Sequence, residues 1–155
     1  MATTFNRTES KELSKLININ EDACEFYDTA CQKVQSRNLK STFLNLKAVH
    51  KGIVVNLQTY LNSRPHSGNP SATQTMIGQA KQLWGEVSAT IGQDTDEIFV
   101  SHLEEAEDRC LNTMADAIDN EGISPDVRRF LGQELGTLKE AHDFVHLLRM
   151  SLNAA

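Results

Sequence analysis

Proline placement is the feature that most constrains the fold of this chain. Its 155 residues contain only three prolines, Pro65, Pro70 and Pro125. Proline removes a backbone donor and clashes with the preceding turn, so it breaks a helix when it lies inside one. Two of the prolines share one short segment, which leaves three long stretches free of this helix breaker. Apolar residues in those stretches repeat every three or four positions, without strict alternation, and this pattern predicts an all-α fold.

Four long helices are expected, joined by short turns into two antiparallel pairs. The first helix is predicted over about 10–36 and the second to about residue 62. In the second half, Asp94 with Glu97 resembles a capping box. Ser124-Pro125-Asp126 supplies a hydroxyl cap, a proline at the first helical position and an acid in the first turn. The stripes predicted to face inward are Leu13, Ile17, Asn20, Cys24, Tyr27, Cys31 and Val34; Leu39, Phe43, Leu46, His50, Ile53 and Leu57; Ile98, Phe99, Leu103, Ala106, Cys110, Met114 and Ala117; and Val127, Leu131, Glu134, Leu138, Ala141 and Val145.

The segment 63–93 separates the two pairs. Residues 63–71 form the clearest loop, and Ser71 with Gln74 predicts a capping box that opens a shorter helix. Gly92 is placed to end that helix. A segment of this length can return along the bundle, which is the connectivity of ferritin-like bundles. We therefore expect a ferritin-like four-helix bundle with an additional crossover helix.

Size and charge limit the protein classes. A mass of 17.3 kDa fits one domain, predicted over 10–153 after a flexible tail at 1–9. The net charge of −6 argues against nucleic-acid or anionic-membrane surfaces. No apolar run is long enough for a membrane span, and the N-terminus shows no export signal. Three cysteines do not form a disulfide framework, so a cytoplasmic location is expected.

Several segments together resemble a known family. They are Glu25-Phe26-Tyr27-Asp28, Leu83-Trp84, Ala106-Glu107-Asp108, Ser124-Pro125-Asp126-Val127-Arg128-Arg129 and Leu138-Lys139-Glu140-Ala141-His142-Asp143. Together they look like a bacterial four-helix-bundle family of unknown function within the ferritin-like superfamily. The resemblance implies a ferritin-like bundle and a connection with stress responses, and it implies no enzymatic activity.

The superfamily raises the question of a metal centre. Ferritin-like di-iron proteins use a Glu-x-x-His motif on each of two helices. Among the five histidines only His146 has an acid three residues earlier, Asp143. His50 and His142 have lysines there, Lys47 and Lys139, and a cation at that place opposes metal binding. The sequence therefore predicts no di-iron centre, and Asp143 is expected to face solvent.

Two other histidine arrangements remain open. His142 and His146 lie four residues apart, a spacing that can chelate one Zn²⁺ ion with Asp143 and an acid of the preceding helix. Those acids are Glu105, Glu107 and Asp108, and the alternative is a solvated surface. His50, Asn20 and Glu134 fall on inward stripes. His50 and Glu134 could meet as a proton-sharing pair or vestigial ligand set, or each could be a hydrogen-bonded core residue that specifies helix register.

No catalytic motif is present, so the sequence favours a non-catalytic protein without a cofactor that acts by protein association. A homodimer is one possibility, through Met76, Trp84 and Ile91 of the crossover helix or through the exposed face of the last helix. Another protein partner is the second. The alternative function is a metal-binding protein, with iron or zinc in a mononuclear or degenerate di-metal site and an oxidoreductase or metal-handling role.

Overall fold

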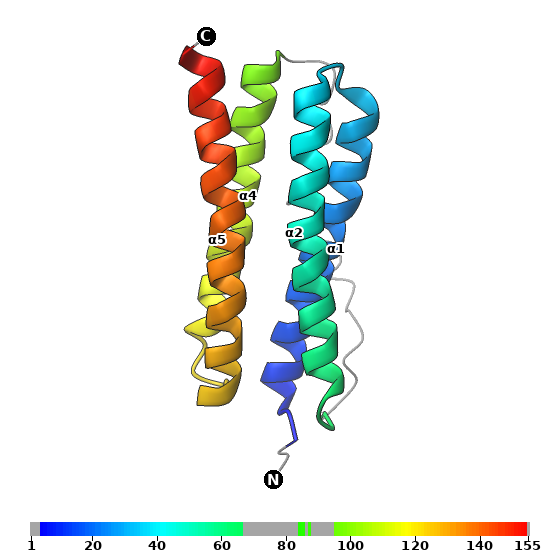
Figure 1. Cartoon of the computed structure of the whole chain (residues 1–155). Helices are drawn as coiled ribbons and strands as arrows, with labels where there is room; N and C mark the ends of the chain where they lie inside the picture. The colour runs from blue at the N-terminus through cyan, green and yellow to red at the C-terminus, as the bar shows by residue number, and fades with distance from the viewer. Residues whose placement is uncertain (1–3, 67–83, 86, 88–94, 155) are drawn as a thin grey trace.

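The structure, a computed structural model, describes residues 4–66, 84, 85, 87 and 95–154, and it is all-helical as predicted. Four long helices form a bundle (Figure 1). They are α1 (Arg7–Lys33), α2 (Arg37–Asn62), α4 (Asp96–Ile118) and α5 (Pro125–Ala154). Within these described ranges, no helix combines the length and apolarity that a bilayer span requires.

The helices form two antiparallel hairpins, α1–α2 and α4–α5, as the short connections predicted (Figure 1). Contacts at one end of the bundle fix how the hairpins are oriented. The Asn6 side chain, at the start of α1, donates to the carbonyl of Gly122, which follows α4 (2.9 Å). Arg64, after α2, lies 3.7 Å from Asp126 at the start of α5. Consequently α1 and α5 run in one direction and α2 and α4 run in the other.

The start of α1 corrects the expected boundary. α1 begins at Arg7, and Asn6 caps it in a capping box with Glu9. Phe5 is fully buried, and its backbone N–H donates to Pro65 O (2.8 Å). The prediction of a flexible tail over 1–9 is therefore wrong for residues 4–9, because the cap and the aromatic anchor tie them to the bundle.

The start of α4 differs by one residue from the sequence pattern. Thr95 is the N-cap, and its hydroxyl accepts from the backbone N–H of Ile98 (3.3 Å). The predicted cap, Asp94, lies outside the described residues. At α5 the prediction is confirmed, since the Ser124 hydroxyl accepts from the N–H of Val127 (3.5 Å).

The core contains most of the predicted inward residues. In α1, however, the buried stripe is rotated. Cys24 and Cys31 are only half-buried, and their thiols donate to the carbonyls of Lys47 and Lys40 in α2. Ile98 of α4 is exposed instead of buried. The stripe that α1 buries completely consists of Leu13, Leu16, Asn20, Ala23, Tyr27 and Ala30.

The predicted crossover helix lies mostly outside the described residues, including Met76 and Ile91. Trp84 and Val87 are described, and both are buried. The Trp84 ring packs on Phe26 of α1, with ring centroids 5.3 Å apart, and Phe26 in turn packs on Phe99 of α4. Trp84 therefore packs into the bundle and is not available as an exposed contact for a partner.

Candidate functional site

Four fully buried polar side chains meet in the interior of the bundle. Asn20 and Tyr27 come from α1, His50 from α2 and Glu107 from α4. His50 Nδ1 lies 2.7 Å from Asn20 Oδ1, and His50 Nε2 lies 2.7 Å from Glu107 Oε1. The Tyr27 hydroxyl donates to the same Glu107 oxygen (2.5 Å). We call these four residues the buried polar cluster; it links the two hairpins.

The hydrogen bonds of the buried polar cluster determine how many protons it holds. Asn20 Nδ2 donates to the carbonyl of Leu16 (2.8 Å), so Asn20 Oδ1 is the atom that faces His50. An amide oxygen only accepts, and His50 Nδ1 must therefore carry a proton. The hydrogen bond between His50 Nε2 and Glu107 needs one further proton, held on the imidazole or on the carboxyl group. Either way, the pair has no net charge.

Ring packing encloses the cluster. Tyr27 stacks on His50 with centroids 5.8 Å apart, and Trp84 meets His50 edge-on at 5.7 Å. Burial and the neighbouring Glu107 carboxyl group raise the pKa of Tyr27 well above its usual value, so the phenol remains a neutral donor. Because no member exposes surface, a substrate could reach the cluster only if the bundle opened. The hydrogen bonds of the cluster join side chains of both hairpins, and a role in specifying helix register stays a prediction for His50.

Glu134 does not take the predicted place beside His50. Its carboxylate accepts from Asn56 Nδ2 of α2 (3.1 Å). Asn56 lies six residues beyond His50, about 9 Å along the helix. Of the two alternatives that the sequence left open, the one in which His50 and Glu134 pair is therefore wrong, and Glu107 occupies that position. Burial raises the pKa of Glu134, because one hydrogen bond from a neutral amide does not compensate for lost hydration.

Glu107 is a core residue that the sequence pattern places on the outer face, as a possible ligand beside His142. The reason is that the inward stripe predicted for this helix runs through Ala106. A second stripe through Val100, Leu103, Glu107, Cys110 and Met114 has the same three- and four-residue spacing. That spacing was the available signal.

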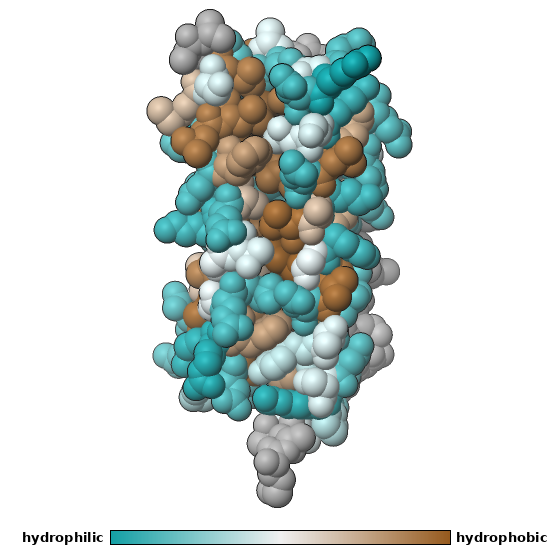
Figure 2. Space-filling model, viewed as in Figure 1, coloured by the Kyte–Doolittle hydropathy of each residue, from teal (hydrophilic) through white to brown (hydrophobic). Residues whose placement is uncertain are grey.

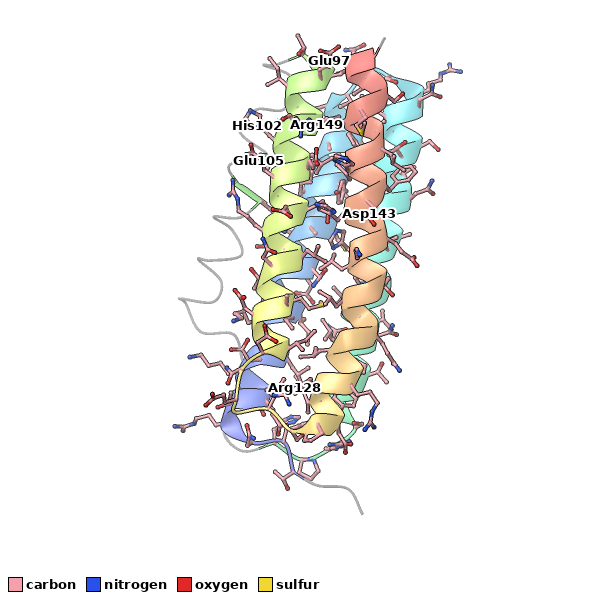
Figure 3. All side chains as sticks on the ribbon, turned by 90° about the vertical axis from the view of Figure 1, so that its left-hand side faces the viewer. Glu97, His102, Glu105, Arg128, Asp143 and Arg149 are labelled. Atoms are coloured by element: carbon pink, nitrogen blue, oxygen red, sulfur yellow. The ribbon has the colours of Figure 1, made fainter. Side chains whose placement is uncertain are left out.

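The histidines of α5 lie in a polar cleft between α4 and α5, with a volume of about 390 Å³. His146 Nδ1 lies 2.6 Å from Glu104 Oε1, and Arg149 donates to the other Glu104 oxygen (2.8 Å). His142 Nε2 lies 3.4 Å from Asp108. Asp143 lies on α5 beside the cleft, and its side chain is 59% exposed, as expected (Figure 3).

The cleft contains paired charges. Burial raises the pKa of Glu104, but the hydrogen bonds from Arg149 and His146 outweigh it and hold this pKa below its usual value. The structure brings His142 and Asp143 together (3.2 Å), while Glu107 lies in the core and does not join them. In the part of the chain that the structure describes, no three His, Cys, Asp or Glu side chains are placed to share one metal ion.

A third candidate is the surface shared by α2 and α5, which we call the α2–α5 face. It includes the exposed side chains of Leu44 and Val55 on α2 and of Phe144, Leu147 and Met150 on α5. Between the helices lies a groove of about 200 Å³. Apolar surface gathers along this face and near the C-terminal end of α5 (Figure 2). The residues that line the groove are Asn45, Leu46, Val49, Glu140, Ala141 and Phe144.

Comparison with known proteins shows the family of this chain. The family model described as Domain of unknown function (DUF2383) matches residues 8–120, well over half of the chain. No curated protein matches the chain, and no solved structure does.

Proposed function

Because the chain belongs to the DUF2383 family, whose function is unknown, its role must be argued from its own residues, and we propose a non-catalytic bundle that associates with another protein chain. The α2–α5 face is the contact surface. The observation that carries the proposal is the distribution of exposed apolar side chains. Six large ones are substantially exposed among the described residues, and five of them lie on α2 and α5. Clustered apolar surface of this kind is typical of interaction sites.

Charge distribution supports the same surface. Between Asn38 and Asn62 the lysines of α2 are Lys40, Lys47 and Lys51. At 100° per residue they fall on one side of α2, and Lys47 binds Asp28 of α1 there (2.7 Å). The side of α2 that turns toward α5, around Asn45 and Asn56, therefore lacks lysine and arginine along this range, and Lys51 borders the exposed Leu44 and Val55. Glu140 is the one charged residue among those that line the groove. Depletion of charge is what distinguishes the centre of protein interfaces from other surface.

The finer parts of the proposal follow from the sequence resemblance to a bacterial four-helix-bundle family within the ferritin-like superfamily. They are a ferritin-like bundle with a crossover helix, bacterial origin, a cytoplasmic location, a role in stress responses and no metal cofactor. The shared direction of α2 and α4 supports ferritin-like connectivity. Lys47 and Lys139 at the ligand positions support the absence of a di-iron centre, as does the engagement of both His50 ring nitrogens by Asn20 and Glu107.

Site-specific photo-crosslinking in cells tests the association. A photoreactive amino acid at Leu147 or Val55 is expected to give discrete crosslinked species. The matched control is the same substitution at Ile98 of α4, which is 47% exposed, as is Val55. The proposal is contradicted if none of the three positions gives crosslinks, or if Ile98 gives as many as Leu147 and Val55.

The metal-binding alternative rests on a different observation. Glu104 and Asp108 of α4 and His142 and His146 of α5 form two facing pairs, each with four-residue spacing. Elemental analysis of untagged protein purified without chelators tests this alternative. Stoichiometric iron, manganese or zinc that is lost on His146→Ala or His50→Ala would replace the association proposal with a metal-handling role.

A further inference from the structure

We propose that the partner on the α2–α5 face is a second copy of this chain, bound in a two-fold symmetric dimer. The inference rests on the proposed function, because it names the partner for the same surface. Two-fold dimers are the commonest protein oligomers, and their interface uses one patch on both subunits. The patch must therefore be complementary to itself.

The polar residues of the α2–α5 face meet that requirement. On α2 the side toward α5 and solvent carries mainly amide and hydroxyl side chains. They are Asn38, Ser41, Thr42, Asn45, Asn56 and Thr59. Each can both donate and accept hydrogen bonds, so each can pair with the same residue type on a second copy. A face made of donors only or acceptors only could not pair with itself in this way.

Charge favours this face over the rest of the surface for self-association. Each chain has a net charge of −6, so two copies repel one another at most orientations. The side with the α4–α5 cleft lies a quarter turn from the α2–α5 face, and it has Glu104, Glu105, Asp108 and Asp143 along its rim, beside His142, His146 and Arg149. The four acids outnumber the one arginine there, so contact between two such clefts would bring an excess of carboxylates together. Contact through the α2–α5 face places only Glu140 of the groove near a second acid.

The available area matches a dimer. The 26 residues of α2 extend about 39 Å, and two adjacent helices are about 20 Å wide. The face therefore offers about 800 Å² per subunit, the usual contribution of one partner to a specific interface. The groove provides space for one large apolar side chain of the other copy. Leu147, 64% exposed, and Met150, 55% exposed, are the most exposed apolar side chains of the face.

The other seam between the hairpins is already occupied. Trp84 is 2% exposed and packs on Phe26 at the side where α1 faces α4. The bundle's own chain thus covers one seam, whereas apolar groups on the α2–α5 side remain in contact with solvent. A second copy that packs there would bury them as Trp84 buries the α1–α4 seam.

Sedimentation equilibrium of the full chain between about 1 and 200 µM tests the dimer. The wild type is expected to reach twice its subunit mass of 17.3 kDa. Val55→Glu and Leu147→Glu should each weaken dimerisation at least 30-fold, as loss of a central interface contact does. Ile98→Glu is the control matched to Val55→Glu, because it adds the same charge at a side chain of equal exposure on α4. Circular dichroism and urea unfolding verify that all three variants fold.

The outcomes separate this inference from the proposed function. A wild type that stays monomeric at 200 µM, or equal weakening by Ile98→Glu and Val55→Glu, would overturn the dimer. Photo-crosslinks from Leu147 at a mass other than twice the subunit mass would also overturn it and would leave the proposed association intact. If neither Val55 of α2 nor Leu147 of α5 gives a crosslink, both the dimer and the proposed association are overturned.

Discussion

His50 Nε2 and Glu107 Oε1 lie 2.7 Å apart in an interior where neither side chain has exposed surface. Asn20 requires the other ring nitrogen of His50 to carry a proton, so the pair shares one further proton and is neutral overall. His50 belongs to the first hairpin and Glu107 to the second. This contact therefore fixes the register of one hairpin against the other, as single buried polar residues do in helical assemblies.

Loss of His50 should destabilise the bundle strongly. His50→Ala leaves the Glu107 carboxyl group and Asn20 Oδ1 buried without this partner, and such loss typically costs about 3–5 kcal/mol. Urea unfolding at pH 7 measures the change. The control His102→Ala removes a half-exposed imidazole of α4 and should alter stability by less than about 0.5 kcal/mol. In a double-mutant cycle with Glu107→Ala, additive effects would show that the two residues are not coupled.

Alkaline pH should destabilise the folded state through Tyr27. The pKa of Tyr27 is raised in the folded protein, so its contribution is fully present below the usual value of 10. Above that pH the unfolded chain releases the phenolic proton and the folded chain retains it, and stability falls by about 1.4 kcal/mol per pH unit. Tyr27→Phe should flatten this dependence between pH 10 and 11, measured by urea unfolding. Tyr60→Phe, at a half-buried tyrosine, should flatten it less; equal slopes in both variants would contradict the burial argument.

Glu134→Gln should stabilise the protein at neutral pH. The folded-state pKa of Glu134 is raised by burial, so its cost is absent below the usual value of 4.5 and grows as pH rises above it. An amide removes that cost and can still accept from Asn56. We expect a gain of up to about 1 kcal/mol at pH 7 and none near pH 4. If Glu134→Gln instead lowers the stability measured by thermal unfolding at pH 7, the folded protein stabilises the ionised carboxylate and the prediction is wrong.

Glu104 should have the opposite pH dependence. Its pKa is lowered in the folded protein, so its contribution is present above the usual 4.5 and is lost as pH falls through the folded-state value. Glu104→Gln is expected to cost about 1 kcal/mol at pH 7, because Arg149 and His146 lose a charged acceptor. Urea midpoints of wild type and variant should converge near pH 3. A difference that persists unchanged at pH 3 would indicate a packing effect instead.

Two glycines should respond oppositely to alanine. A Cβ at Gly122 would lie 2.8 Å from Cγ2 of Thr8, a branched side chain that cannot easily yield. A Cβ at Gly132 of α5 would meet nothing within 4 Å. Alanine is more stable than glycine inside a helix by about 0.5–1 kcal/mol, so Gly132→Ala should raise the thermal midpoint. Gly122→Ala should lower it. Midpoints that move in the same direction would contradict the contact with Thr8.

The sequence predicted the helical elements well because each depends on local signals. Proline positions, caps and apolar spacing determined four helices and two hairpins, and the predicted stripes of α2 and α5 are largely buried. The start of α1 was missed although Asn6 and Glu9 form a capping box, because the apolar repeat begins only at Leu13. The buried anchor Phe5 depends on Pro65 and Tyr60, which are distant in sequence.

The buried polar cluster was only half predictable. Asn20 and His50 were placed inward because they fall on apolar stripes. Glu107 was not, since a rotation of one position moves a residue between core and surface, and a carboxylate favours the surface assignment. Which acid contacts His50 depends on how far the two hairpins are shifted against each other along the bundle axis. No local signal encodes that offset, so Glu134 and Glu107 could not be distinguished before the hairpins were aligned.

Trp84 is the one tryptophan in the chain, and its ring meets the edge of His50. Its fluorescence therefore arises beside the contact between His50 and Glu107. The protein carries an intrinsic optical probe at the contact that joins its hairpins. Separation of the hairpins can be followed in real time, without any added label, as a change in the emission of this single residue.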